Sequence, residues 1–500
     1  MTSARRVLVA NRGEIALRII RACHEEGIEA VAVYSDADRL SPHVRAADLA
    51  IPIGAAPPRE SYLRIDRLIG AARRGGAWAV HPGYGFLAER AAFAEAVNNA
   101  GLVFIGPPAE AIAAMGDKTE ARRRMAAAGV PIVPGLTLPI TDPEAAASAA
   151  AEIGYPVLVK ASAGGGGKGM RIVERPGDLA GALATAASEA AKAFGDPSVY
   201  LEKYIVRPRH IEIQVLADAH RTVFLGEREC SVQRRHQKLV EEAPSAAVSP
   251  DLRARMGAAA VAAASAVGYR SAGTCEFLLA ADGSFYFLEM NTRIQVEHPV
   301  TELVFGVDLV REQLRIAQGL PMRVPEGLLT PRGWAIECRI TSEDPGNGFL
   351  PSSGRIEYLR PPAGPGVRWD GGFEAGNDVT LYYDSLLGKI VAWGATRAEA
   401  ITRMRRALSE MVVTGIATNQ AFHLRLLADP AFERSEIDSQ FLDRRPDLLK
   451  VELDESRLLG LAVAAALAED EARRQRRPAV PEDRPGGTEW ARSARRESLR

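Results

Sequence analysis

Two glutamates in residues 274–302, TCEFLLAADGSFYFLEMNTRIQVEHPVTE, give the first indication of chemistry. Asp282-Gly283 is a two-residue hairpin signal between two runs rich in aromatic and aliphatic residues. If Ala281 faces Ser284 across this turn, counting back places Glu276 opposite Glu289. Like charges about 4.5–5.5 Å apart across a strand pair repel each other. We therefore expect a cation between these two carboxylates.

A third oxygen donor follows on the same strand. Asn291 has the strand parity of Glu289 and adds an amide oxygen to the two carboxylates. Such ligands suit a hard cation such as Mg²⁺, which in proteins usually also binds substrate phosphates. The alternative is a solvated hairpin that carries two surface acids, so the metal hypothesis requires a phosphate-binding segment elsewhere in the chain.

A glycine-rich run, GGGGKG at 164–169, is the candidate for that segment. It lies between the strand-like stretches YPVLVK and MRIVE, so it is neither a Rossmann fingerprint nor a Walker A loop, both of which lead into a helix. A strand–loop–strand hairpin of this kind can fold over a nucleotide, because glycines let backbone N–H groups approach phosphates closely. Lys160 ends the first strand, where it can meet phosphate charge. The alternative is a flexible linker.

Polar residues also cluster at 227–242, where HQKLVEE follows the apparent strand TVFLGE. Gln233, His236 and Lys238 lie in this stretch, which is too polar to predict as core. The lysines Lys118, Lys160, Lys203 and Lys238 suit point-charge contacts to phosphate. For each residue taken alone, a solvated strand face is the competing interpretation.

After the hairpin, alternate residues of NTRIQVEHPVTE place Arg293, Gln295 and Glu297 on one face with Asn291. A guanidinium, an amide and a carboxylate in a row suit the binding of a small planar anion and the removal of its proton. A polar strand face is again the alternative. Arg339, in the first strand of the next region, could approach the same place.

Bulk composition excludes several classes of protein. The chain has 500 residues and a net charge of −1, which gives no reason to expect nucleic acid as a partner. Its four cysteines form no CxxC pair and no disulfide framework. No apolar tract approaches the ~20 residues that span a bilayer, and the N-terminus does not resemble a signal peptide. We expect a cytoplasmic protein with no membrane contact.

The order of apparent strands and helices predicts a multidomain protein of α/β and α+β parts. We expect an open α/β domain at 1–115, a second domain at 116–330 whose lid covers about 132–204, and an α+β domain at 331–445. An alanine-rich helix within 446–475 and a tail at 476–500 follow. The tail mixes Arg, Glu, Pro and Gly, and we expect it to be disordered.

Nine strings spread from residue 10 to residue 389 resemble a known family. They are ANRGEIALRI (10–19), HPGYGFLAE (81–89), MGDK (115–118), KASAGGGGKGM (160–170), RHIEIQVLAD (209–218), QRRHQK (233–238), EMNTRIQVEHPVTE (289–302), ECRI (337–340) and YYDSLLGK (382–389). In this order they resemble biotin carboxylase, the ATP-grasp subunit of biotin-dependent acyl-CoA carboxylases. The similarity covers about residues 5–442.

The resemblance implies an ATP-grasp fold with an N-terminal pre-ATP-grasp domain and a biotin carboxylase C-terminal domain. It implies a ligase that uses ATP, Mg²⁺ (or Mn²⁺) and bicarbonate to carboxylate biotin through carboxyphosphate. Biotin would be a carrier-bound substrate. The chain has no Met-Lys-Met motif, so we expect a biotin carboxyl carrier protein in trans. We also expect a homodimeric state and a carboxyltransferase subunit as partner.

The resemblance also assigns roles to matching positions. The nucleotide and phosphate contacts it implies are Lys118, Lys160, Gly165, Gly166, Gly167, Met170, Glu202, Lys203, Ile205, His210, Gln233, His236, Lys238 and Leu278. The metal ligands it implies are Glu276, Glu289 and Asn291. Arg293, Gln295, Val296 and Glu297 match the bicarbonate site, with Glu297 as base, and Arg339 matches the residue that stabilises the biotin enolate.

Two other functions remain open from sequence. One is an ATP-grasp ligase that activates a different carboxylate, against which the RIQVEHP segment argues. The other is a non-catalytic ATP-binding paralogue, against which the intact Glu276, Glu289, Glu297 and Lys238 argue. Bicarbonate-dependent ATP cleavage separates the three possibilities.

Overall fold

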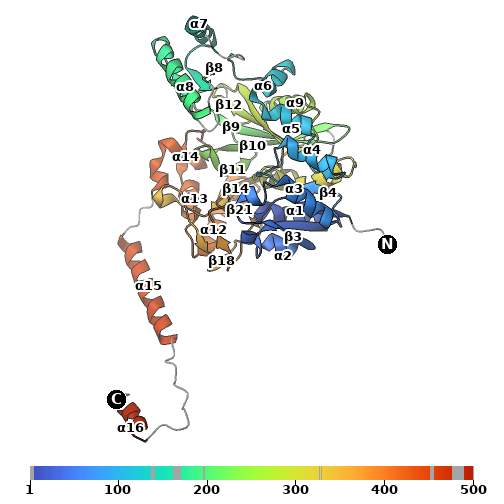
Figure 1. The fold of residues 1–500 in the computed structure, drawn as a ribbon. Helices are drawn as coiled ribbons and strands as arrows, with labels where there is room; N and C mark the ends of the chain where they lie inside the picture. Colours follow the sequence, from blue (N-terminus) through green and yellow to red (C-terminus); the bar gives the residue numbers. More distant parts are fainter. Residues whose placement is uncertain are drawn as a thin grey trace. The chain divides into compact units, whose positions relative to one another are not determined.

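The computed structural model describes residues 5–136, 140, 142–161, 170–194, 197–325, 327, 329–450, 455–475 and 489–498. The chain divides into two compact units, Met1–Leu449 and Lys450–Arg500. Figure 1 shows the helices and strands of both. Short 3-10 turns lie at Asp36–Asp38, Pro58–Glu60, Pro176–Asp178, Pro345–Asn347, Leu442–Arg444 and Pro446–Leu449.

A five-stranded parallel sheet forms the N-terminal domain, as predicted. Its order is β3-β2-β1-β4-β5, with β1 (Arg6–Val9), β2 (Glu29–Ser35), β3 (Leu49–Gly54), β4 (Ala79–His81) and β5 (Val103–Phe104). The helices are α1 (Gly13–Glu25), α2 (Pro42–Ala46), α3 (Ile65–Arg74), α4 (Ala91–Asn99) and α5 (Ala109–Gly116). Strand order reverses between β1 and β4, and crevices for ligands form at such switch points, beyond the carboxyl ends of the strands.

An eight-stranded antiparallel sheet forms the centre of the molecule, in the order β13-β12-β9-β10-β11-β14-β21-β19. Its strands are β9 (Arg209–Ala217), β10 (Thr222–Arg234), β11 (Gln237–Ala243), β12 (Ser271–Leu279), β13 (Phe285–Asn291), β14 (Trp334–Thr341), β19 (Val367–Gly371) and β21 (Leu386–Gly394). The sheet crosses the boundary expected near residue 330, because β11 pairs with β14 from Val240↔Cys338 to Ala243↔Ala335. The region from 331 therefore extends the central sheet.

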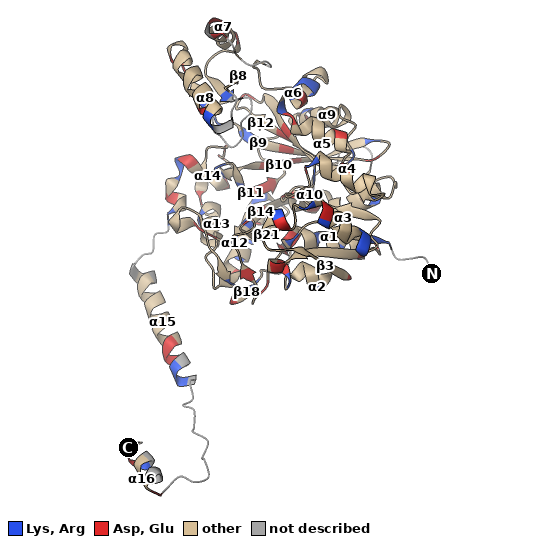
Figure 2. Cartoon of the chain, viewed as in Figure 1, with Lys and Arg blue, Asp and Glu red and all other residues tan. Residues whose placement is uncertain are grey.

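The two faces of this sheet differ because side chains alternate along each strand. Ile211, Ile213 and Phe277 pack in an apolar core with α9 (Pro250–Ser265). The opposite parity carries His210, Glu212 and Glu276, all buried. Figure 2 shows charged positions on the central strands.

The remaining elements of this unit are helices and short strands. The helices are α6 (Lys118–Ala127), α10 (His298–Phe305), α11 (Leu309–Ala317), α12 (Arg397–Glu410), α13 (Gln420–Leu427) and α14 (Pro430–Glu433). The short strands are β15 (Glu343–Asp344), β16 (Leu350–Pro351), β17 (Gly354–Arg355), β18 (Tyr358–Arg360), β20 (Asp378–Val379) and β22 (Val412–Thr414).

A separate three-stranded sheet, ordered β7-β6-β8, lies in the region predicted as the lid. It comprises β6 (Val157–Ala161), β7 (Met170–Val173) and β8 (Val199–Lys203), with α7 (Pro143–Ile153) and α8 (Leu179–Phe194). Lys160 pairs with Met170 across β6 and β7, which confirms strands on both sides of the glycine-rich run. That run, with Gly165, Gly166 and Gly167, lies outside the described residues.

The register of the β12–β13 hairpin corrects one prediction. Leu279 pairs with Phe285 and Phe277 with Phe287, so Ala281 does not face Ser284 as expected. A bulge then places Leu288 as an extra residue in β13, and beyond it Glu276 pairs with Glu289. The predicted glutamate pair is therefore correct, although a wider turn and a bulge produce it, and their effects on the register cancel.

The C-terminal unit contains α15 (Glu455–Gln475) and α16 (Glu489–Glu497). The first matches the alanine-rich helix expected there. The second corrects the expectation of disorder for its part of the tail, since its Ala, Arg and Glu residues favour helix. No described helix combines the length and apolar character needed to cross a membrane.

The packing of Phe277 against Phe285 and Phe287 should contribute strongly to the stability of the protein. Phe277 is fully buried, with its ring centroid 5.6 Å from that of Phe285 and 6.0 Å from that of Phe287. We expect Phe277→Ala to lower the free energy of unfolding by about 3–5 kcal/mol in urea titrations, because it leaves a cavity. The control Tyr358→Ala, at a half-exposed position, should change it by about 0.5 kcal/mol or less.

Candidate active site

A cleft of about 640 Å³ lies where the N-terminal domain meets the polar face of the central sheet. The segments that follow β1 and β4 line one side, at the switch point, and include Arg12, Glu14 and Tyr84. The other side comes from β9 to β14 and the segment before α10. It carries the predicted residues His210, Gln233, His236, Lys238, Glu276, Glu289, Asn291, Arg293, Gln295, Val296, Glu297 and Arg339. The structure thus brings together in one cleft all of the positions predicted to act on bicarbonate and metal.

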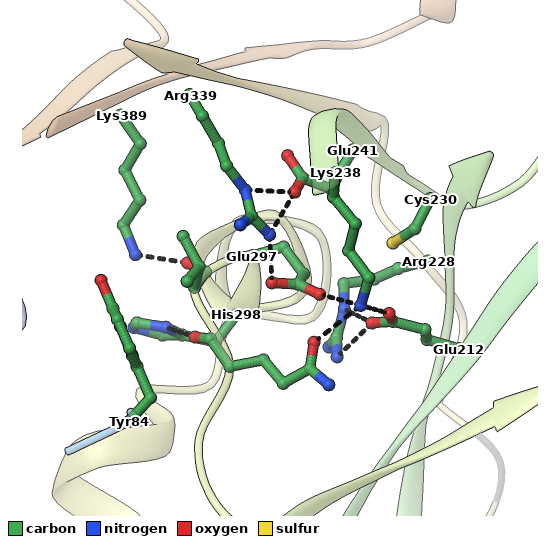
Figure 3. Close-up of polar contacts among 12 residues, drawn as sticks. Tyr84, Glu212, Arg228, Cys230, Lys238, Glu241, Glu297, His298, Arg339 and Lys389 are labelled. Atoms are coloured by element: carbon green, nitrogen blue, oxygen red, sulfur yellow. Dashed lines mark hydrogen bonds and ion pairs between the residues drawn. The ribbon is translucent and has the colours of Figure 1, made fainter. Parts of the chain in front are cut away.

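The ammonium group of Lys238 is the centre of the polar network in Figure 3. Its Nζ donates to Glu276 Oε1 at 3.0 Å and to Glu297 Oε1 at 2.8 Å, and it also contacts Glu212. Gln295 Oε1 lies 3.2 Å away. Burial alone would lower the pKa of Lys238, but the surrounding carboxylates raise it well above its usual range. Lys238 is therefore charged and joins three strands to the segment before α10.

Arg228 supplies a second buried cation behind Lys238. Its guanidinium is fully buried and donates to Glu212 Oε2 at 3.1 Å. Burial would raise the pKa of Glu212, but the cations led by Lys238 lower it. His210 Nε2 lies 3.1 Å from Glu276, and this carboxylate, with Glu212, raises the pKa of His210 to about 9 despite burial. His210 is therefore a further cation near neutral pH.

Glu297 has the geometry of a general base. It is the N-cap residue of α10 and its carboxylate is 1% exposed. Lys238 binds one oxygen, and Arg339 Nη2 donates to the other at 2.9 Å. Burial and the neighbouring Glu212 would raise the pKa of Glu297, but Lys238, Arg339 and Arg228 together lower it. Glu297 is therefore ionised and able to accept a proton near neutral pH.

Glu241 orients Arg339 from the next strand. Its Oε1 accepts from Arg339 Nε at 2.6 Å, while Arg339 also binds Glu297. Burial raises the pKa of Glu241 to about 7, with Arg339 opposing and Glu297 reinforcing the rise. The guanidinium plane of Arg339 is thus fixed at two points and faces the cleft.

The predicted metal ligands meet at the edge of this network. Asn291 Nδ2 donates to Glu276 Oε1 at 2.8 Å. Burial, and then repulsion by Glu276, raise the pKa of Glu289, with Lys118 opposing the rise. A divalent cation between the two carboxylates would relieve their repulsion. The donor set therefore fits Mg²⁺ or Mn²⁺.

A second trio, His210, Glu212 and Glu276, has ligand atoms close enough to hold an ion. Lys238 already binds both carboxylates of that trio. In the pair of Glu276 and Glu289, Lys238 binds only Glu276, so this pair is the better site for a cation.

Arg293 does not point freely into the cleft. Its Nε donates to Glu89 Oε2 at 2.9 Å, and its Nη2 to Asn291 Oδ1 at 2.8 Å. Gln295 Nε2 lies 3.2 Å from Glu276 Oε1. Both side chains nevertheless line the cleft beside Glu297, where an anion would meet a guanidinium and an amide.

A neighbouring cavity of about 290 Å³ contains the other predicted phosphate contacts, Lys118 and Lys160. Lys160 Nζ binds Glu202 Oε2 at 2.9 Å, and Arg122 Nη1 binds the other oxygen at 2.9 Å. Glu289 and Asn291 line both cavities, so the metal site lies between them. The arrangement suits a nucleotide whose phosphates extend toward the larger cleft.

Four predicted nucleotide contacts lie elsewhere. Lys203 Nζ donates to the carbonyls of Gly154 and Tyr155 at 2.8 and 3.0 Å. Met170, Ile205 and Leu278 are not among the described residues that line either cavity. For all four residues the nucleotide contact stays a prediction.

Sequence reasoning missed several residues of the network. Glu212 could have been found, since it shares the strand parity of His210 and pairs directly with Glu276. Glu241 and Glu337 face each other across β11 and β14, a contact between segments almost a hundred residues apart. Arg228 looked like one of many charged residues in a polar strand, and only its burial distinguishes it.

Three family models match the chain in succession. They describe a biotin carboxylase N-terminal domain at 3–112, a carbamoyl-phosphate synthase L chain ATP-binding domain at 117–324, and a biotin carboxylase C-terminal domain at 337–444. The chain is also 52% identical over 441 residues to biotin carboxylase 1 of Bacillus subtilis, covering 88% of this chain and 98% of that protein.

This chain belongs to the biotin carboxylase family.

Other members differ in the carboxylase they serve. A relative from Methanothermobacter thermautotrophicus, named as a subunit of pyruvate carboxylase, is 52% identical over 439 residues, which are 88% of this chain and 89% of that protein. Among solved structures, the biotin carboxylase domain dimer of Hydrogenobacter thermophilus 2-oxoglutarate carboxylase, in complex with MgADP, ADP and bicarbonate, has a TM-score of 0.83 and 46% identity. It covers 90% of this chain and 99% of that one.

Removing the ammonium group of Lys238 from the buried carboxylates around it should destabilise the protein in a pH-dependent way. Lys238→Met leaves Glu212, Glu276 and Glu297 without the ammonium that helps to lower their pKa values. Their pKa values then rise, so keeping them ionised at neutral pH costs stability. In urea titrations with EDTA, we expect a loss of about 3–5 kcal/mol at pH 7.5 and a smaller loss near pH 5.

The matched control is Lys192→Met, at an exposed lysine of α8. It should change the free energy of unfolding little at either pH. An equal loss from Lys238→Met at both pH values would contradict the electrostatic account.

Proposed function

We propose that this chain is the biotin carboxylase subunit of an acyl-CoA carboxylase of acetyl- or propionyl-CoA type. It would use ATP and bicarbonate to carboxylate biotin on a separate carrier. The observation that carries the proposal is the sequence of groups along one cleft. The cleft contains, in order, the carboxylates of Glu276 and Glu289 that suit a metal ion, the ionised base Glu297, and the guanidinium of Arg339, which two carboxylates hold in place.

The nucleotide would occupy the smaller cavity, with its phosphates toward Glu289. Lys160 must then exchange Glu202 for phosphate, while Arg122 keeps the Glu202 carboxylate paired. Glu276, Glu289 and Asn291 would hold Mg²⁺, which when bound neutralises charge on the phosphates.

Bicarbonate would lie between Arg293, Gln295 and Glu297. Glu297 removes its proton, and the resulting oxygen attacks the γ-phosphorus of ATP with ADP as the leaving group. Lys238 stabilises the charge that develops. The product of this step is carboxyphosphate.

Carboxyphosphate then breaks to CO₂ and phosphate inside the cleft. Exclusion of water from the cleft would protect carboxyphosphate from hydrolysis before this step. The phosphate takes the proton of the biotin ureido nitrogen, and Arg339 stabilises the oxygen anion that forms. The nitrogen attacks CO₂ to give carboxybiotin. Glu241 holds the guanidinium in place for this step.

The partners follow from the same proposal. Relatives described as subunits support a biotinyl carrier and a carboxyltransferase on other chains, and the Hydrogenobacter domain dimer supports a homodimer. The relatives named for pyruvate and 2-oxoglutarate favour a second candidate acceptor class, the 2-oxo acids. Assay of the assembled complex with acetyl-CoA, propionyl-CoA and pyruvate distinguishes the classes.

The purified chain should cleave ATP only when bicarbonate and Mg²⁺ are present, and free biotin should increase the rate. Phosphate release measured with and without bicarbonate, in CO₂-depleted buffer, checks this. Cleavage that does not depend on bicarbonate would indicate the ligase for another carboxylate, and absence of cleavage with intact ATP binding would indicate the non-catalytic paralogue.

Glu297→Gln should retain ATP binding and lose turnover. The amide preserves the shape of the side chain but cannot accept the bicarbonate proton, and general-base catalysis contributes about 10²–10⁴-fold. Bicarbonate-dependent phosphate release should fall by that factor, while calorimetric ATP affinity stays near that of the unaltered protein. Glu95→Gln, at an exposed glutamate of α4, serves as control. Unchanged turnover in Glu297→Gln would remove Glu297 from the role of base.

A further inference from the structure

Lys389 on β21 is a fully buried lysine that the mechanism above does not use. Its Nζ donates to the carbonyl oxygen of Val296 and lies 3.2 Å from Glu14 Oε1 of α1. Tyr84, from the segment after β4, donates its hydroxyl to the same glutamate. One ammonium group thus contacts the N-terminal domain and the segment before α10 from a strand of the C-terminal region. Figure 3 shows Lys389 reaching toward that segment beside Tyr84.

A buried ammonium group is costly unless charged partners compensate it. Burial would lower the pKa of Lys389, but Glu14, then Glu337 and Asp370, raise it. Lys389 therefore remains a cation in the interior. The ammonium group of Lys389 therefore holds the Val296 carbonyl and the Glu14 carboxylate in a fixed geometry.

Of the two groups that contact the Lys389 ammonium, Val296 lies in the segment proposed to bind bicarbonate. Its side chain is apolar, so it can contact an anion only through its backbone N–H. That N–H has no hydrogen-bond acceptor among the described residues, although Val296 lines the cleft. The carbonyl of Val296 and the N–H of Glu297 form one peptide unit, and the bond from Lys389 fixes the orientation of this unit. The Val296 N–H belongs to the preceding unit, whose Gln295 carbonyl lies 2.6 Å from His298 Nδ1.

We propose that Lys389 is a positioning residue for bicarbonate, because it holds the peptide unit between Val296 and Glu297 in the orientation that presents the Glu297 carboxylate to the anion, next to the Val296 N–H. Glu14 and Tyr84 keep the ammonium in place from the opposite wall of the cleft. The inference rests on the proposed function, since it assigns a role in the binding of that function's substrate.

The test is steady-state kinetics of the full chain with Lys389→Met, which keeps most of the side-chain volume and removes the ammonium. The loss of a charge-assisted hydrogen bond that shapes the anion site should raise the KM for bicarbonate by about tenfold to a hundredfold. The KM for ATP should stay within about twofold, because the nucleotide cavity does not include Lys389. Lys192→Met is the control for loss of an exposed lysine.

Glu14→Gln provides a second variant if Lys389→Met does not fold. The amide oxygen can still accept from Lys389 and Tyr84, but the countercharge is gone. We expect a smaller rise in the KM for bicarbonate, again with the KM for ATP unchanged. Calorimetric titration of ATP into each variant checks that the nucleotide site is intact.

The outcomes distinguish failure of the proposed function from failure of the positioning role of Lys389. If the unaltered protein shows no bicarbonate-dependent ATP cleavage, the proposed function fails first. If it does, but the variants keep the KM for bicarbonate, or lose affinity for ATP and bicarbonate to the same extent, then Lys389 only stabilises the fold and the positioning role is overturned.

Discussion

The polar side of this molecule depends on one contact, the ammonium group of Lys238 between Glu212, Glu276 and Glu297. Three carboxylates this close would repel one another, and each alone would be neutral when buried. With Lys238 and Arg228 present, their pKa values are lowered and they remain ionised although they are buried. A base and a metal ligand can therefore lie on neighbouring elements without neutralising each other.

Two sheets of different kinds place these groups. The parallel sheet supplies a crevice at its switch point, and the antiparallel sheet supplies a face on which every second residue points into that crevice. Neither sheet could form the site alone. The antiparallel sheet carries the ionisable groups on fixed strands, and the parallel sheet closes them in with Glu14, Tyr84 and the segments around them.

Local patterns were sufficient for much of this architecture. Strand parity correctly predicted that Glu276 pairs with Glu289, and the strands on both sides of the glycine-rich run were also predicted correctly. Counting residues back from the predicted turn gave the correct glutamate pair partly because two errors cancelled. The turn is wider than predicted, and the bulge at Leu288 shifts the register by one residue in the opposite direction. Contacts between distant segments could not be predicted in this way. Glu241 on Arg339, Glu89 on Arg293 and Lys389 on Val296 each depend on how separate sheets and domains pack.

The continuous eight-stranded sheet has a consequence for how the protein folds during synthesis. The family models divide the chain between residues 324 and 337, yet β11 receives its outer neighbour only when β14 emerges. Until then its outer edge carries unpaired backbone groups, which is the kind of edge that recruits other chains. Completion of the site thus awaits translation of the C-terminal region, and the nascent polypeptide passes through a stage in which it is open to aggregation.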